Sequence, residues 1–318
     1  MSFHIADNIA LQNVLATMDS SRQKIASTQK KGYFFIAGGI AVAIIGIAMG
    51  MVVAAIIAGL VPIVYGSILF YKIRDELKAY RHTYKIDVIG EALRFLDQSL
   101  TIRPYEGIQI GEFVFSQLFA REPDRYKTED LVMGIAGKTG FYFAEVHAEY
   151  KTVTQTKNGT RTEWHDLFKG IIFVADFNKN FNAITIVRPK DFGRAIGAWF
   201  SKNLFSFGNS DVIKLENPEF DQAFVTYGND QVESRYILTP SMMERILQLN
   251  QKSKYSINLS FIKSRMYIGF PLDRNYFEAP IFKSLLNPNL LDEDINAIKF
   301  MYDIVKELDL NTRIWGKQ

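Results

Sequence analysis

Three ionisable side chains recur at every second position of one segment: Glu145, His147 and Glu149. Successive side chains of a β-strand point to opposite faces, so this spacing places all three on one face of a strand. Carboxylates beside an imidazole are the groups that an acid–base pair or a metal site needs. Three polar groups on a strand face are more often simply solvated, and we expect that here. The sequence therefore predicts no cofactor and no bound metal, and offers these residues as candidates for catalysis.

A β-hairpin is predicted to carry this face, because Asn158-Gly159 favours a two-residue hairpin turn. Pairing outward from that turn places Val153 opposite Trp164, and it keeps His165 away from His147. In the same register the remaining predicted pairs are Lys151–Asp166, Tyr150–Leu167, Val146–Ile171, Glu145–Ile172 and Ala144–Phe173. A strand over residues 131–136 precedes the hairpin and makes it a three-stranded meander. Residues 171–174 are apolar on both faces, which indicates an interior strand.

The surrounding elements predict an α+β fold with a mainly antiparallel sheet and interposed helices. Residues 257–261 and 266–270 alternate as a second hairpin, half-buried and turning at Lys263-Ser264. Thr239-Pro240 is typical of a helix start, and that helix should run to about Gln251. Another helix is expected over residues 191–204. A last helix opens at Asp292 and has one apolar face: Ile295, Ile298, Met301, Ile304, Val305 and Leu308.

A second polar group, Asp230, Glu233 and Arg235, is interpreted as an anchor that orients a strand into the helix at Thr239. The sequence lacks a phosphate-binding Gly-rich loop with Lys-Ser/Thr, a G-x-S-x-G elbow and an H-E-x-x-H helix. It also has no cysteine, which excludes disulfides, thiolate metal ligands and cysteine nucleophiles. With a net charge of +3 and no basic stripe in its globular part, it is not expected to bind nucleic acid.

An uncharged stretch from Gly32 to Tyr71 dominates the N-terminal region. A membrane-spanning helix needs roughly 20 apolar residues, so this stretch fits two spans, 33–49 and 52–71, with a turn near Gly50 and Met51. Basic residues flank it on both sides: Lys24, Lys30 and Lys31 before it, and Lys72, Arg74, Lys78, Arg81 and Lys85 after it. The positive-inside rule then places both termini in the cytoplasm and predicts a multi-pass protein of the cytoplasmic membrane.

Small residues recur along both predicted spans. They are Gly39, Ala43, Gly46 and Gly50 in the first, and Ala54, Ala58, Pro62 and Gly66 in the second. Such stripes let helix backbones approach closely in lipid, either within the hairpin or between protomers of a homo-oligomer. The predicted domains are a cytoplasmic helical segment 1–31, the transmembrane hairpin 32–71, juxtamembrane helices 72–100 and a cytoplasmic domain 101–318. A boundary near residues 205–210 would divide the last into lobes 101–207 and 208–318.

Four motifs resemble an uncharacterised bacterial family, the domain-of-unknown-function 3137 family. They are Phe-Lys-Gly-Ile-Ile-Phe-Val-Ala-Asp-Phe-Asn at 168–178, Glu-Asn-Pro-Glu-Phe at 216–220, Asp-Gln-Val-Glu-Ser-Arg-Tyr-Ile-Leu-Thr-Pro at 230–240, and Asn-Thr-Arg-Ile-Trp at 311–315. The resemblance implies a bacterial inner-membrane protein with a two-helix anchor and no assigned activity. It also hints at an assembly shared with LemA-type membrane proteins.

These observations favour a non-enzymatic scaffold or regulatory adaptor that is anchored in the lipid bilayer and binds a protein partner. Two alternatives stay open. One is an enzyme or metal-binding domain that uses the face of Glu145, His147 and Glu149. The other is a lipid-binding domain, because basic residues beside the membrane attract anionic head groups.

Overall fold

The structure is a computed structural model that describes residues 9–119, 121–156, 159–177, 181–190, 211–287, 289–308 and 310. The chain divides into two compact units: Met1–Ala92 with Phe277–Ile295, and Leu93–Tyr276 with Asn296–Gln318. Each unit therefore combines segments that are far apart in the sequence. The expected helix over 191–204 and the expected lobe boundary near 205–210 lie outside the described residues.

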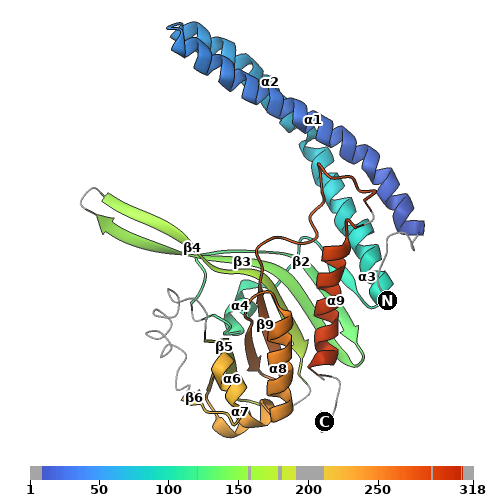
Figure 1. Ribbon diagram of the computed structural model, residues 1–318, viewed down its shortest axis with the longest axis vertical. Coiled ribbons are helices and arrows are strands. Elements are labelled where there is room, and N and C mark those ends of the chain that lie inside the picture. Colours follow the sequence, from blue (N-terminus) through green and yellow to red (C-terminus); the bar gives the residue numbers. More distant parts are fainter. Residues whose placement is uncertain are drawn as a thin grey trace. The chain divides into compact units, whose positions relative to one another are not determined.

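A long antiparallel helical hairpin forms most of the first unit (Figure 1). Its helices are α1 (Ile9–Ala48) and α2 (Val52–Thr83), followed by a π-helical turn (Tyr84–Ile89) and α3 (Gly90–Leu96). The turn between α1 and α2 lies where the sequence predicts it, and Gly50 adopts a φ of 81°, which favours glycine. Both helices are long and apolar enough to cross a membrane.

Small residues bring α1 and α2 into close contact. A Cβ atom at Gly39 would lie 2.5 Å from the carbonyl oxygen of Gly59, and one at Gly46 would lie 2.4 Å from the Cβ atom of Ala55. Gly66 likewise faces the backbone of the first helix, at the carbonyl oxygen of Gly32. These positions leave room for hydrogen atoms only, so the glycines set the distance between the helices.

The predicted stripe on the second helix is partly wrong for this contact. Ala54 and Ala58 are exposed, whereas Ala55 and Gly59 are buried. The reason is geometric: a repeat of four residues rotates by about 40° at each step, because a turn contains 3.6 residues. Ala55, Gly59, Pro62 and Gly66 are spaced four, three and four residues apart, and this alternation keeps them on one face of the helix. Gly50 also does not pack against the other helix, since a Cβ atom there would have no neighbour within 4 Å.

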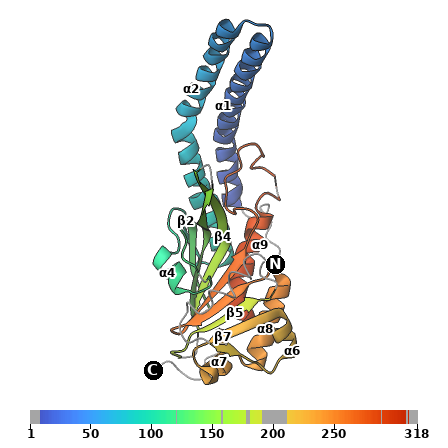
Figure 2. The same ribbon diagram turned by 90° about the vertical axis from the view of Figure 1, so that its left-hand side faces the viewer.

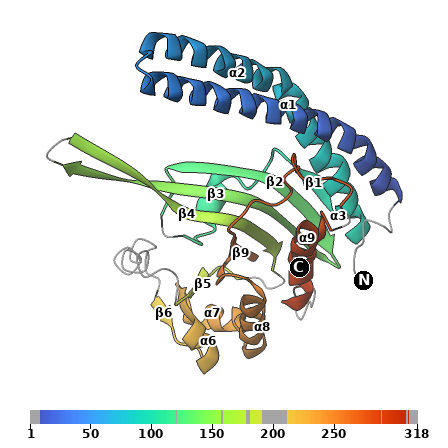
Figure 3. The same cartoon turned by 45° about the horizontal axis from the view of Figure 1, so that its top comes forward.

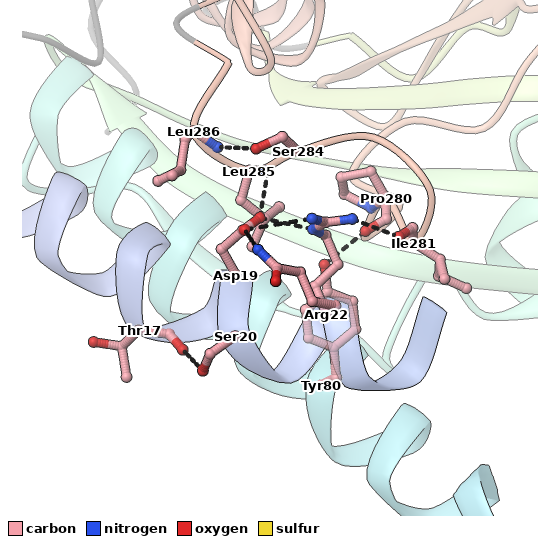
Figure 4. A network of polar contacts seen from close by, with 11 residues as sticks. Thr17, Asp19, Ser20, Arg22, Tyr80, Pro280, Ile281, Ser284, Leu285 and Leu286 are labelled. Atoms are coloured by element: carbon pink, nitrogen blue, oxygen red, sulfur yellow. Dashed lines mark hydrogen bonds and ion pairs between the residues drawn. The ribbon is translucent and has the colours of Figure 1, made fainter. Parts of the chain in front are cut away.

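The segment 277–291 completes the first unit by binding to the polar ends of α1 and α2 (Figure 4). The Asp19 carboxylate accepts hydrogen bonds from Arg22 Nε at 2.7 Å and from the Leu285 backbone N–H at 3.0 Å. Arg22 donates to the Ile281 carbonyl at 3.0 Å, and the Tyr80 hydroxyl donates to the Pro280 carbonyl at 2.7 Å. Polar groups that are buried at this place are thus paired.

A nine-stranded antiparallel sheet forms the second unit, in the order β1-β2-β3-β4-β9-β8-β5-β7-β6. The strands are β1 (Thr101–Arg103), β2 (Arg125–Ala136), β3 (Thr139–Thr156), β4 (Gly159–Asp176), β5 (Thr185–Pro189), β6 (Asp211–Ile213), β7 (Phe224–Gly228), β8 (Asn258–Ile262) and β9 (Arg265–Pro271). The helices are α4 (Ile110–Phe115), α6 (Pro218–Ala223), α7 (Gln231–Ile237), α8 (Pro240–Lys252) and α9 (Asp292–Glu307). The α+β prediction is confirmed. Because β5 lies between β8 and β7, strands from both sides of residue 207 share this sheet.

The second hairpin has the predicted register, with Leu259 opposite Ile268 and Phe261 opposite Met266. Its turn is Lys263-Ser264, with φ angles of 47° and 59°. The expectation that this hairpin is half-buried is wrong, because β8 is buried along its whole length. Helix α4 covers one face of the sheet, whereas α8 and α9 cover the other (Figure 2).

The hairpin of β3 and β4 differs from its predicted register. Thr156 pairs with Gly159, so Gly159, which the prediction placed in the turn, already belongs to β4. Val153 therefore lies opposite Thr162, and Lys151 lies opposite Trp164. Each described pair near this end of the hairpin is therefore displaced by two residues from the predicted register. A β-bulge farther along reduces the displacement to one, so Glu145 pairs with Ile171.

Candidate functional site

The three candidate residues of β3 differ in burial and in their partners. Glu145 is 8% exposed, and its Oε1 accepts a short hydrogen bond from the backbone N–H of Tyr276. Its carboxylate thereby fixes the chain after β9 to the surface of the sheet. His147 and Glu149 lie farther along the strand and are more exposed. Glu145 thus fulfils a structural role that the sequence did not indicate.

The carboxylate that contacts His147 is that of Asp166 in β4, whereas the sequence analysis considered Glu145 and Glu149 as its partners. The atoms His147 Nε2 and Asp166 Oδ1 are 2.7 Å apart, and Asp166 pairs with Glu149 across the strands. His147, Glu149 and Asp166 each offer one ligand atom, and these atoms all lie within 4.8 Å of one another. These are the residues of this face that could hold a metal ion.

A β-bulge in β4 produces this arrangement. Ala148 pairs with Phe168 and Glu149 pairs with Asp166, so Leu167 is the extra residue. Both Leu167 and Phe168 are buried, although neighbouring side chains of a regular strand point to opposite faces. Two adjacent apolar residues after the alternating polar segment were the signal for the bulge. Because the prediction contained no bulge, it placed Asp166 opposite Lys151 and did not include Asp166 among the candidate site residues.

Arg125 and Trp164 border this group. The Arg125 guanidinium lies 3.4 Å from the centre of the Trp164 ring, a cation–π contact, and its Nη1 is 4.0 Å from Glu149 Oε2. His165 lies elsewhere, as expected. Its ring stacks on Tyr150 at a centroid distance of 5.1 Å, and its Nε2 is 2.9 Å from the Thr152 hydroxyl.

A cavity of about 80 Å³ adjoins Glu145 and His147. Pockets for small-molecule ligands usually enclose roughly 300–1,000 Å³, so this cavity is too small for an ordinary substrate. It is lined by Lys127, Thr128, Glu129, Glu145, Val146, His147, Lys169, Gly170, Leu272, Arg274 and Asn275. Its size favours a role in holding water or a small ion over a role in catalysis on a metabolite.

The second polar group was wrongly assigned to a strand. Asp230 caps α7, and its carboxylate accepts hydrogen bonds from the backbone N–H groups of Val232 and Glu233. Glu233 in turn accepts hydrogen bonds from the backbone N–H groups of Asn182 and Ala183. These contacts are structural, because each carboxylate satisfies backbone donors that would otherwise lack partners.

The β3–β4 hairpin projects beyond the remainder of the sheet as a two-stranded arm (Figure 3). Among the described residues, β2 pairs with β3 only up to Glu149, and β9 pairs with β4 only from Gly170. We call residues 150–156 and 159–165 the arm. His147, Glu149 and Asp166 lie at its base.

Comparison with known proteins places part of the chain in a family. Residues 166–310 match the family described as "Protein of unknown function (DUF3137)", which confirms the resemblance over slightly less than half of the sequence. The crystal structure of the mycobacterial trehalose monomycolate transport factor A, TtfA, is similar over 71% of this chain and 94% of its own, with 8% identity and a TM-score of 0.34. That likeness is too weak to support an argument about function. No curated protein matches the sequence.

Proposed function

We propose that this chain, a member of the DUF3137 family, is a membrane-anchored adaptor whose second unit binds a protein partner at the cytoplasmic face of the bacterial inner membrane. The observation that carries the proposal is the apolar surface of the helical hairpin. Large apolar side chains such as Phe34, Val53 and Val61 are exposed along the two helices. An apolar surface of this extent is unfavourable in water and is suited to lipid.

The charges at the hairpin support its orientation. The uncharged stretch 32–71 lies at the closed end of the hairpin, and the basic flanks belong to the opposite, open end. At that end, Lys24 Nζ of α1 is 2.8 Å from Glu76 Oε1 of α2, so charged residues begin at the same level in both helices. This distribution fits a hairpin that enters the membrane from the cytoplasm and returns to it.

The arm supports the adaptor role. Within the described residues no third strand pairs with the arm, although the side chains of Arg121 and Asp124 bond the main chain of Lys151. Val153 and Trp164 of the arm expose apolar surface. Unpaired strand edges bind extended peptide segments by forming additional main-chain hydrogen bonds. We therefore assign partner binding to the arm, with a LemA-type membrane protein or a second copy of this chain as partners to be tested.

Single-cysteine variants test the orientation, because the natural sequence contains no cysteine. In intact bacteria, a membrane-impermeant maleimide should label Met51→Cys in the hairpin turn. Ser27→Cys in α1 and Thr154→Cys in the arm should react only after lysis. Labelling of either of these two in intact cells would refute the proposed orientation.

A photo-crosslinking amino acid at position 153 tests the partner site. It should yield a discrete protein adduct in cells, whereas the same probe at Val232, which is exposed on α7, should not. Adducts with lipid instead of protein would favour the lipid-binding alternative. Equal adducts from both positions, or none from position 153, would contradict the assignment to the arm.

A further inference from the structure

We propose that His147, Glu149 and Asp166 bind one divalent metal ion of the zinc type at the base of the arm. The sequence predicted no metal, because three polar groups on one strand face are more often simply solvated. The structure joins an imidazole nitrogen and two carboxylate oxygens within 4.8 Å of one another. This mixture of nitrogen and oxygen donors suits zinc and similar ions, whereas calcium and magnesium prefer oxygen alone.

The ligand atoms lie within 4.8 Å of one another, so binding of an ion has to bring some of them closer and separate one pair. Ligand atoms on a tetrahedral zinc ion are about 3.3 Å apart, given bonds of about 2.0 Å. The atoms His147 Nε2 and Asp166 Oδ1 are now 2.7 Å apart, so an ion would separate them slightly and replace their hydrogen bond. The side chains of His147, Glu149 and Asp166 are 38%, 25% and 64% exposed, so the ion has access from solvent and water can complete its coordination.

Neighbouring groups orient the ligands. Glu149 Oε2 lies 4.0 Å from Arg125, which is itself held against Trp164, so one carboxylate oxygen can face the guanidinium while the other binds the ion. Such partners fix the direction of a metal ligand. The nearby amine of Lys127 is paired with Glu129 at 2.8 Å, which limits its repulsion of a cation.

The position of the site suggests its effect. Two of the ligands come from β3 and one from β4, at the level where β2 ceases to support them. An isolated two-stranded hairpin is only marginally stable in water. An ion that joins both strands at the base would therefore hold the arm in its extended form. Metal binding requires neither a partner at the arm nor a particular orientation of the helical hairpin, so it can be tested independently of the adaptor proposal.

The test uses the full chain in detergent, prepared without a polyhistidine tag, stripped with a chelator and titrated with Zn²⁺. We expect one ion per chain by calorimetry and by metal analysis after desalting. His147→Ala and Asp166→Asn should each weaken binding by more than about 100-fold, since even the loss of an outer-shell partner costs 10–100-fold. His165→Ala is the matched control, because this histidine adjoins Asp166 in sequence but faces Tyr150, and it should leave binding unchanged.

Two further measurements separate a built site from incidental binding. Bound Co²⁺ should give visible absorption bands that Zn²⁺ abolishes and that His147→Ala lacks. Zn²⁺ should also slow hydrogen exchange of the arm in the wild type but not in His147→Ala. Should His147→Ala fail to fold by circular dichroism, Glu149→Gln replaces it. The proposal is overturned if the wild type binds no ion, if all variants bind equally, or if Mg²⁺ competes at a concentration similar to that of Zn²⁺.

Discussion

Replacement of Asp19 by Asn should release the segment 277–291 from the helices α1 and α2. The Asp19 side chain is 5% exposed, and four hydrogen bonds meet at its carboxylate: two from Arg22, one from Gln23 and one from the Leu285 backbone. Asparagine keeps the shape of the side chain but removes its charge. Arg22 would then remain in a largely buried place without an anionic partner.

The pKa of Asp19 indicates how much the ionised carboxylate stabilises the first unit. The hydrogen bond from Arg22 is the main cause that lowers the pKa of this carboxyl from 3.8 to about 2, and the Leu285 N–H acts in the same direction. Each pKa unit corresponds to about 1.4 kcal/mol, so the ionised carboxylate stabilises the folded unit by about 2–3 kcal/mol. Loss of that charge, with Arg22 left unpaired, should cost between about 2 and 4 kcal/mol.

Hydrogen exchange of the detergent-solubilised protein measures this effect. A loss of about 2–3 kcal/mol should speed exchange at the Leu285 amide roughly 30- to 150-fold, provided that exchange occurs through local opening. The matched control is Asp75→Asn in α2, whose side chain is 89% exposed, and it should change nothing. Unchanged protection at Leu285 in Asp19→Asn, or an equal loss in Asp75→Asn, would refute the argument.

The same carboxylate predicts a dependence on pH. Its folded-state pKa lies below the ordinary value of 3.8, so the stabilisation is complete above about pH 4. It should disappear as the pH falls from about 4 towards 2, because both states then bind the proton. Protection at Leu285 should decline over this range in the wild type. In Asp19→Asn the decline should be smaller, once the intrinsic effect of pH on exchange is subtracted.

Three other substitutions have expected outcomes. Gly59→Leu should lower the midpoint of thermal unfolding in detergent, because a Cβ atom there meets the Gly39 carbonyl oxygen at 2.7 Å; the exposed control Ala58→Leu should have little effect. Phe173→Ala, at a fully buried position, should cost about 3–5 kcal/mol in chemical denaturation of the second unit. Thr239→Ala removes the hydroxyl that caps α8 and should cost about 1 kcal/mol in the same assay.

Local chemistry explains the features that the sequence predicted correctly. The cap at Thr239, the turn at Lys263-Ser264 and the turn at Gly50 each depend on a few adjacent residues. The apolar face of α9 is also legible, because its period follows the helix itself, and Ile298, Ile304 and Val305 are all buried. Such features need no knowledge of distant segments.

The group of His147, Glu149 and Asp166 at the base of the arm could not be predicted from the sequence, because it depends on the exact register of β3 and β4. An Asn-Gly pair indicates a hairpin turn but does not fix its position to the residue. A shift of the turn by one residue changes the cross-strand partner of every residue by two positions. The bulge at Leu167 then adds one residue to β4. The position of the turn and the bulge together decide whether Asp166 lies opposite Lys151 or opposite Glu149. Only the second pairing brings Asp166 to His147.

The composition of the first unit lay beyond sequence reasoning for a different reason. Asp19 and Leu285 are 266 positions apart, and no periodicity connects them. A polar residue in an amphipathic helix is ordinarily expected to face water, so Asp19 and Arg22 gave no sign of burial. Their burial means that the helical hairpin does not form the first unit alone, because its polar end is completed by residues 277–291. The chain passes between the two units within α3, between Tyr276 and Phe277, and again within α9, so each unit combines distant parts of the sequence. Truncation after residue 276 should therefore destabilise the first unit, although it removes none of the apolar residues 32–71.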